Sequence, residues 1–240
     1  MSIVQTETEK QIARESGRRL AAVLYKVIER VAPGVTPRDL DAYALKLIKE
    51  GGDEPSFLGY KPSGAKTPYP ATLCVSVNDE VVHGIPKDAP FKEGDIVGLD
   101  IGLTHQGFIT DMARTVPVGA IDTEAQKLIT TTEKALAEGI KAVKAGGRVG
   151  DIGHMVESYV KRGGFSIVRE LGGHAVGKKV HEEPFIPNCG EKGTGAEIAE
   201  GMVLALEPIV NEGSPKIFLD KDGYTFKTKD GRRSAHFEDT

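Results

Sequence analysis

The chain has 240 residues, of which 39% are hydrophobic and 28% are charged, a balance typical of a globular protein that buries an apolar core. Its formal net charge of -4 provides no general attraction to nucleic acid or to an anionic membrane, so neither is expected as a partner. No apolar run approaches the ~20 residues that span a bilayer, and two cysteines are too few for a disulfide framework, so we expect a cytoplasmic protein without a targeting segment.

Two helices are predicted at the start of the chain. Apolar residues recur on one helical face over residues 8–31, where Thr8 and Gln11 form a candidate capping box. Residues 36–52 begin with a Thr-Pro pair and end with two glycines, which is typical of a second helix. Residues 53–70 are rich in glycine, proline and serine and are expected to form a loop.

A strand and a hairpin are predicted next. Residues 72–77 are expected to form a strand that turns at residues 78–80. The stretch at 96–116, IVGLDIGLTHQGFITDMARTV, contains two apolar segments joined by His-Gln-Gly at 105–107. We therefore expect an antiparallel hairpin there.

Each strand of this hairpin contains one carboxylate in apolar surroundings. Asp100 interrupts the first segment and Asp111 follows a short apolar run in the second, and the hairpin would bring the two side chains together. The pattern recurs at Glu207 in MVLALEPIV and at Glu238 in AHFEDT. A strand-end cap or an exposed position would explain any one of them, but the recurrence favours a shared cation, because an unpaired buried carboxylate is strongly unfavourable.

Two further helices and several short strands follow. Thr123 is expected to cap a long helix, and another helix is expected over residues 151–162, ended by two glycines. Asp-Gly pairs at 222–223 and 230–231 separate three short strand-like segments, which predicts a C-terminal antiparallel meander. Grouped helices with largely antiparallel strands indicate the α+β class.

The chain contains an internal repeat. A shift of 112 positions aligns residues 31–52 with residues 143–164 without a gap, including both Gly-Gly pairs. Chance similarity between two amphipathic helices is the alternative explanation. We predict one catalytic domain over residues 1–240, formed by two halves at about 8–118 and 119–240.

A candidate metal site can be assembled from the acidic residues and one histidine in GGHAVG. The candidate ligands are Asp100, Asp111, His174, Glu207 and Glu238. Oxygen donors with a single imidazole suit Mn, Fe(II), Co or Zn. Two divalent ions would neutralise four carboxylates and one would not, so two divalent metal ions are the better-balanced hypothesis.

The sequence resembles type I methionine aminopeptidases over nearly its whole length. The motifs that carry the resemblance are VNDEVVHGIP, DIVGLDIGLTHQGFITDMART, ELGGHAVGKKVHEEP, MVLALEPIV and DGYTFKTKDGRRSAHFEDT. Their joint occurrence in this order is highly specific, whereas HGIP or HEEP alone would be weak evidence. The resemblance implies the pita-bread fold, with two pseudo-symmetric halves and a central antiparallel sheet.

The resemblance also implies a reaction. Such enzymes remove the initiator methionine from proteins and peptides with a small second residue, when a metal-bound hydroxide attacks the scissile carbonyl. It implies that the five candidate ligands hold two metals and that Glu207 also moves a proton. His181 would stabilise the oxyanion and His83 would contact the scissile amide nitrogen.

Substrate pocket and partners follow from the same resemblance. The methionine side chain would be surrounded by Phe57, Tyr60, Tyr69, Cys74 and Tyr224. The implied partners are nascent polypeptide N-termini, and a monomer is expected. Docking on the ribosome and the identity of the metal in the cell stay open.

Three features depart from the family's pattern. Val180 stands where an aromatic residue is common, the loop at 58–71 is longer than usual, and Asp239 replaces a histidine beside Glu238, shortly before the chain ends. They put in doubt the shape of the pocket and how firmly Glu238 is held.

Two alternative functions stay open. One is an X-Pro aminopeptidase or prolidase of the same fold, which is expected to need an additional N-terminal domain before Thr8. The other is a catalytically inactive pita-bread binding module, which is expected to have lost metal ligands, whereas all five are present here.

Overall fold

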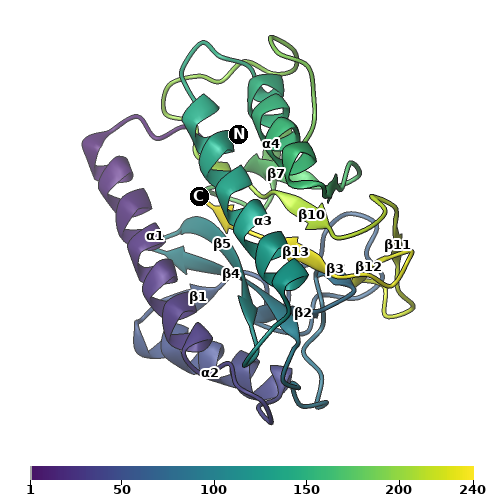
Figure 1. Cartoon of the computed structure of the whole chain (residues 1–240). Coiled ribbons are helices and arrows are strands. Elements are labelled where there is room, and N and C mark those ends of the chain that lie inside the picture. Colours follow the sequence, from purple (N-terminus) through teal and green to yellow (C-terminus); the bar gives the residue numbers. More distant parts are fainter. Residues whose placement is uncertain (1) are drawn as a thin grey trace.

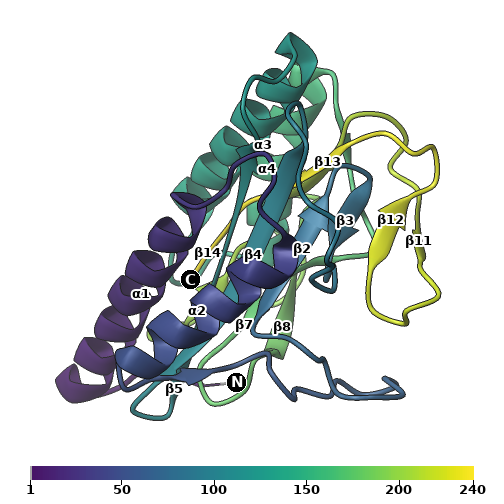
Figure 2. The same cartoon turned by 90° about the horizontal axis from the view of Figure 1, so that it is seen from below.

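Four amphipathic helices form in the computed structural model, which describes residues 2–240. They are α1 (Glu7–Ile28), α2 (Pro37–Glu50), α3 (Thr123–Ala142) and α4 (Val149–Gly163). The second helix begins with Pro37 after the Thr36 cap and ends at Glu50, directly before the predicted Gly51-Gly52 stop. Figure 2 shows all four helices on one side of the strands.

The strands are short, apart from one long hairpin. They are β1 (Glu54–Pro55), β2 (Leu73–Val77), β3 (Glu80–Val82), β4 (Ile96–His105), β5 (Phe108–Pro117), β6 (Ser166–Ile167), β7 (Gly172–Ala175), β8 (Glu182–Pro187), β9 (Leu204–Ala205), β10 (Ile209–Asn211), β11 (Ile217–Leu219), β12 (Phe226–Thr228), β13 (Ser234–His236) and β14 (Glu238–Asp239). Every pairing between these strands is antiparallel. The predicted α+β class is confirmed.

The central sheet is organised around the predicted hairpin. It has five strands in the order β1-β4-β5-β14, with β2 also paired to β4. Gln106 and Gly107 connect β4 to β5 with φ angles of 49° and 77°. A two-residue hairpin turn needs positive φ at both positions, because only then does its twist match that of the strands. The hairpin prediction is confirmed.

Two apolar cores join the helices to the strands. Leu24 of α1 and Leu40 of α2 pack with Leu99 of β4 in one core. Leu128 of α3 and Ile152 of α4 belong to the other core. In Figure 1 the purple α1 runs along the left side and α2 lies at the bottom, the teal α3 runs down from the top beside the green α4, and β4 and β5 lie between α1 and α3.

The two copies of the internal repeat share a positive φ at two matched pairs of glycines. Gly34 and Gly146 have φ angles of 90° and 78°, and Gly52 and Gly164 have φ angles of 75° and 83°. Positive φ strongly favours glycine, which explains why these four matched positions carry it. The division into two pseudo-symmetric halves stays a prediction. A superposition of α1–α2 on α3–α4 tests it, and different helix crossing angles would contradict it.

Some boundary predictions were wrong. Thr6, not Thr8, caps α1, because its hydroxyl accepts from the backbone of Glu9 while the Glu9 carboxylate accepts from the backbone of Thr6. Asp122, not Thr123, caps α3 through its carboxylate. The carboxylates of Glu9 and Asp122 also interact favourably with the dipoles of the helices that they begin, and the two predicted caps did not take this into account. The expected loop at 53–70 contains the short strand β1.

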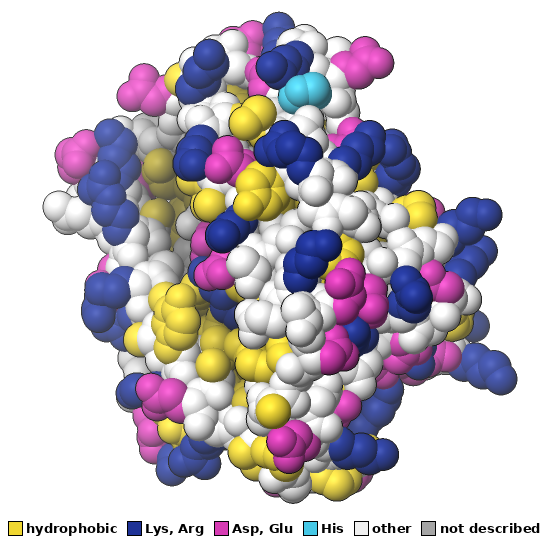
Figure 3. All heavy atoms as spheres, in the orientation of Figure 1, with side chains coloured by type: hydrophobic (Ala, Val, Ile, Leu, Met, Phe, Trp, Pro, Cys, Tyr) yellow, Lys and Arg dark blue, Asp and Glu magenta, His cyan; other side chains and the backbone are white. Residues whose placement is uncertain are grey.

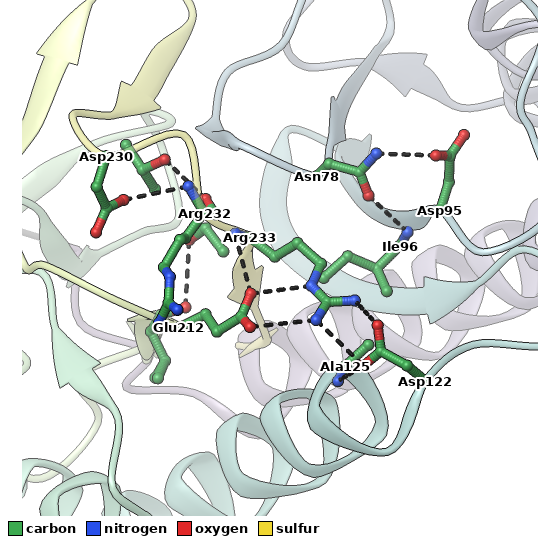
Figure 4. Close-up of polar contacts among 12 residues, drawn as sticks. Asn78, Asp95, Ile96, Asp122, Ala125, Glu212, Asp230, Arg232 and Arg233 are labelled. Atoms are coloured by element: carbon green, nitrogen blue, oxygen red, sulfur yellow. Dashed lines mark hydrogen bonds and ion pairs between the residues drawn. The ribbon is translucent and has the colours of Figure 1, made fainter.

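The predicted C-terminal meander was only partly right. Strands β11 and β12 pair, but β12 continues to β3, and β13 pairs with β10 instead. Arg233 forms ion pairs beside this pairing: its Nη1 lies 2.6 Å from Asp122 Oδ2 and its Nε lies 2.9 Å from Glu212 Oε2 (Figure 4). This double ion pair holds the segment before β13 beside β10 and the start of α3.

The surface carries charges of both signs. On the face shown in Figure 3, Lys and Arg side chains alternate with Asp and Glu side chains, with small apolar areas between them. Among the helices of residues 2–240, none combines the length and the apolar character that crossing a lipid bilayer requires.

Candidate metal centre and substrate pocket

The register of the central sheet places three carboxylates on one face. Asp100 of β4 lies opposite Ala113 of β5, and Ala113 lies opposite Glu238 of β14. Asp111 precedes Ala113 by two positions and lies opposite Gly102. Direct partners in antiparallel strands, and alternate residues within a strand, point to the same face. Only the methyl group of Ala113 therefore stands between Asp100 and Glu238 in this row.

His174 reaches the same point from β7. Its Nε2 lies 3.8 Å from Glu238 Oε1, and its Nδ1 lies 3.0 Å from the carbonyl oxygen of Ala175. A proton on Nδ1, donated to that carbonyl, leaves the Nε2 lone pair facing the carboxylates, which is the usual arrangement of a metal-binding histidine. Asp111, His174 and Glu238 offer ligand atoms that lie within 4.8 Å of one another.

The last residues hold the two carboxylates of β5 and β14 in place. The Thr240 hydroxyl accepts from the backbone N–H of Asp111 at 2.9 Å and donates to its carbonyl at 2.8 Å. Arg114 donates to the carbonyl of Glu238 at 2.7 Å and lies 2.6 Å from Asp239 Oδ1. Figure 1 shows the C-terminus beside β5. The sequence left open how firmly Glu238 is held; in the structure, Arg114 holds this segment through the Glu238 carbonyl and Asp239.

Several buried polar atoms at this point lack a hydrogen-bond partner within residues 2–240. They are Asp100 Oδ1, Asp111 Oδ1, His236 Nε2 and Glu238 Oε1. Buried polar atoms are nearly always paired, and each unpaired one costs about 1–3 kcal/mol. Orphaned oxygen and imidazole atoms that converge on one place fit a divalent cation in both position and donor type.

The same crowding changes the protonation of the acids. Burial, with the neighbouring Asp111, raises the pKa of Asp100 and of Glu238 well above the ordinary range. Burial and the neighbouring Glu207 raise the pKa of Asp111 to about 7, and burial raises the pKa of Glu207 to about 8. Without a cation, the site therefore retains protons near neutral pH.

The metal-free protein is expected to lose thermal stability between about pH 6.5 and about pH 9. Asp111 and Glu207 have folded pKa values of about 7 and about 8, against ordinary values of 3.8 and 4.5. The folded chain therefore binds more protons than the unfolded chain at neutral pH, and this proton binding stabilises the fold. The stabilisation is complete below the ordinary pKa values of 3.8 and 4.5, and it is lost as the pH rises through the folded pKa values of about 7 and about 8. Burial lowers the pKa of His174 from the ordinary 6.5 to about 4. Above about pH 6.5 the imidazole is neutral in both the folded and the unfolded chain, so His174 adds no pH dependence between about pH 6.5 and about pH 9.

The expected loss is on the order of 2 kcal/mol, or about 5 °C in Tm. Differential scanning fluorimetry in a chelator measures it, and saturation with Mn²⁺ should remove the pH dependence because the cation stabilises the ionised acids. A flat Tm profile in the chelator would contradict the raised pKa values.

Two other histidines lie beside this cluster. His181 Nδ1 lies 2.9 Å from the Tyr60 hydroxyl, and its ring centroid lies 4.5 Å from that of His174. A Tyr60 hydroxyl that donates to Nδ1 leaves the proton on Nε2. His83 has a φ of 59°, uncommon outside glycine, and burial together with His181 lowers its pKa to about 4, so its imidazole is neutral at pH 7.

An apolar cavity of about 70 Å³ opens beside the histidines. Its walls include all five predicted pocket residues and Val180: Phe57, Tyr60, Tyr69, Cys74, Val180 and Tyr224. A second cavity of about 370 Å³ is lined by Glu207 and His174. His83 and His181 line both cavities, so the apolar pocket adjoins the acidic cluster.

The long loop at 58–71 forms one edge of the apolar cavity. It is closed on itself by hydrogen bonds from the Gly59 N–H to the Tyr69 carbonyl at 2.9 Å and from the Tyr69 N–H to the Tyr60 carbonyl at 2.8 Å. The Tyr69 hydroxyl donates to the Gly84 carbonyl at 2.9 Å. These bonds fix the aromatic walls of the pocket.

Sequence analysis missed one residue of this site. His236 is 3% exposed, and its Nε2 lies 3.3 Å from Glu207 Oε2 and 3.7 Å from Glu238 Oε2. The available signal was the spacing of His236 and Glu238, because residues two apart in an extended segment point to the same side.

Comparisons with known proteins place the chain in a family. The model of metallopeptidase family M24 matches residues 11–240. A methionine aminopeptidase of Clostridium perfringens is 43% identical over 240 residues, which cover 100% of this chain and 94% of that protein.

Solved structures of methionine aminopeptidases have the same fold as this chain. The crystal structure of methionine aminopeptidase from Rickettsia prowazekii has a TM-score of 0.94 at 36% identity, and that from Thermotoga maritima has a TM-score of 0.93 at 40% identity. Each alignment covers 99% of this chain and 94% of the other. The three proteins named above are methionine aminopeptidases; the fold is therefore the pita-bread fold, and the chain belongs to metallopeptidase family M24.

Proposed function

We propose that the protein removes N-terminal methionine from polypeptides with a small second residue, in a metal-dependent reaction. One observation carries the proposal: a cluster of buried acids with orphaned oxygen atoms adjoins an apolar cavity, and His83 and His181 line the boundary. The names of the relatives support methionine as the residue removed.

Five residues would hold the metal. They are Asp100, Asp111, His174, Glu207 and Glu238. Four ionised carboxylates carry four negative charges, so the proposal is two divalent cations, drawn from Mn, Fe(II), Co and Zn. When bound, such cations polarise a carbonyl group and lower the pKa of coordinated water.

Three side chains would handle protons and charge. Glu207 lines the larger cavity, where its carboxylate could take a proton from water and deliver it to the leaving amine. His181 would donate its Nε2 proton to the carbonyl oxygen as negative charge develops there, oriented by the hydroxyl of Tyr60. The neutral His83 would contact the scissile amide nitrogen.

The apolar cavity would receive the methionine side chain. Phe57, Cys74 and Val180 present apolar surface, and the rings of Tyr69 and Tyr224 meet edge to face at 5.1 Å. An unbranched thioether fits such aromatic walls and gains from contact with ring edges.

The setting we propose is a monomer that acts on nascent polypeptide N-termini in the cytoplasm. Co-sedimentation with ribosomes tests direct docking, and analytical ultracentrifugation tests the oligomeric state.

The proposed activity is tested with metal-free protein to which each divalent ion is added in turn. Met-Gly and Met-Ala peptides should be cleaved only after metal addition, and a chelator should abolish cleavage. Faster cleavage of X-Pro peptides by the same metal-saturated protein would assign the X-Pro alternative instead. Absence of cleavage with every ion and peptide would favour the binding module.

A further inference from the structure

His236 is a buried imidazole at the metal centre to which the proposed function assigns no role. It is 3% exposed, and its Nε2 has no hydrogen-bond partner within residues 2–240. The closest carboxylate oxygen, Glu207 Oε2, lies 3.3 Å away, but the two atoms lack hydrogen-bond geometry. A buried imidazole nitrogen that faces carboxylates without a hydrogen bond is suited to binding a cation.

Glu238 lies between two imidazoles. Its Oε1 lies 3.8 Å from His174 Nε2, and its Oε2 lies 3.7 Å from His236 Nε2. Each oxygen of this carboxylate therefore faces a different histidine. A carboxylate in this position can bridge two cations, each of which would be in reach of one imidazole.

The surrounding ligand atoms form two overlapping groups. Asp111, His174 and Glu238 make one group, and Glu207, His236 and Glu238 make the other, with the ligand atoms of each group within 4.8 Å of one another. Metal–ligand bonds of about 2.0–2.2 Å place the ligands of one ion up to about 4 Å apart. Both groups therefore need to contract only slightly to surround an ion.

We propose that His236 is a ligand of the second cation, so that each of two cations is bound by one imidazole. The proposal rests on the metal-dependent function above, but it concerns the ligand set and does not depend on the substrate. A second nitrogen donor makes the site suited to Zn, Co or Fe(II) at the expense of Mn, because imidazole favours the former and carboxylate the latter.

The test compares the metal-binding properties of the full chain with those of His236→Gln. Glutamine keeps a polar side chain but is a much poorer ligand than imidazole. His154→Gln, on α4 (Val149–Gly163) and outside the cluster, is the matched control. Metal-free proteins are titrated with Co²⁺ by calorimetry, and the zinc-loaded proteins are studied by X-ray absorption.

The wild type and His154→Gln should bind two equivalents, with an average of about one imidazole per zinc. In His236→Gln, one equivalent should bind at least about tenfold more weakly while the other keeps its affinity, and the average should fall to about half an imidazole per zinc. Unchanged affinities and imidazole number in His236→Gln would overturn the proposal.

The measurement stays decisive if His236→Gln does not fold. In the wild type loaded with two zinc ions, an average of about half an imidazole per zinc would by itself exclude His236 as a ligand. Failure of this proposal can be told apart from failure of the proposed peptidase activity, because neither the calorimetric titration nor the X-ray absorption measurement uses a substrate.

Discussion

Replacement of Asp111 by asparagine should lower the metal content and reduce kcat/KM by at least about a hundredfold. Asp111 is 3% exposed and lies on the same face as Asp100 and Glu238, where its Oδ1 has no hydrogen-bond partner within residues 2–240. Asparagine keeps the volume but provides a neutral amide, so the charge that balances the cations is lost. Elemental analysis and assays on a Met-Gly peptide measure the two effects.

Asp88→Asn is the matched control for this variant. Asp88 pairs with Arg38 on the surface, so its replacement removes the same charge without touching the centre, and metal content and rate should stay as in the wild type. If Asp111→Asn bound two equivalents of metal with wild-type affinity and kept its rate, Asp111 would not be a ligand.

Replacement of His181 by alanine should lower kcat by about 30- to 1,000-fold while metal content stays unchanged. The side chain is placed in no ligand group, and the proposed role is a hydrogen bond to charge that develops only in the transition state, a contribution of about 2–4 kcal/mol. The loss should therefore appear mainly in kcat, with little change in KM.

Tyr60→Phe is the graded companion of this variant. It removes the hydroxyl that lies 2.9 Å from His181 Nδ1 and leaves the imidazole in place, so we expect a smaller loss in kcat, by about tenfold. A His181→Ala protein that is folded, fully metallated and as fast as the wild type would refute the proposed role. A joint loss of Tm and metal would point to a supporting role in the fold instead.

Local patterns in the sequence predict the hairpin and its carboxylates correctly. Asp100 and Asp111 interrupt apolar segments, and the turn at 105–107 sets the register, so their shared face follows from two-residue periodicity alone. The structure brings Glu207, Glu238 and His174 to the same place, as the resemblance implied. Spacing by itself does not predict this, because these residues come from other segments of the chain.

Long-range pairing is where sequence patterns fail. Asp-Gly turn signals predict neighbouring strands, yet β13 pairs with β10 and not with β12, and Arg233 beside this pairing binds Asp122 and Glu212. The spacing of His236 and Glu238 was an available signal, but the proximity of His236 to Glu207 depends on the pairing of β10 with β13. An ion pair between distant segments leaves no periodic signal in the sequence.

Anomalous diffraction from crystals loaded with Mn²⁺ or Co²⁺ tests the central claim most directly, because it locates the cations without assuming an activity. The account predicts peaks among Asp100, Asp111, Glu207 and Glu238, with oxygen ligands at about 2.0–2.2 Å. Metal-saturated crystals with no anomalous density among these carboxylates, or with density only elsewhere on the protein, would contradict it.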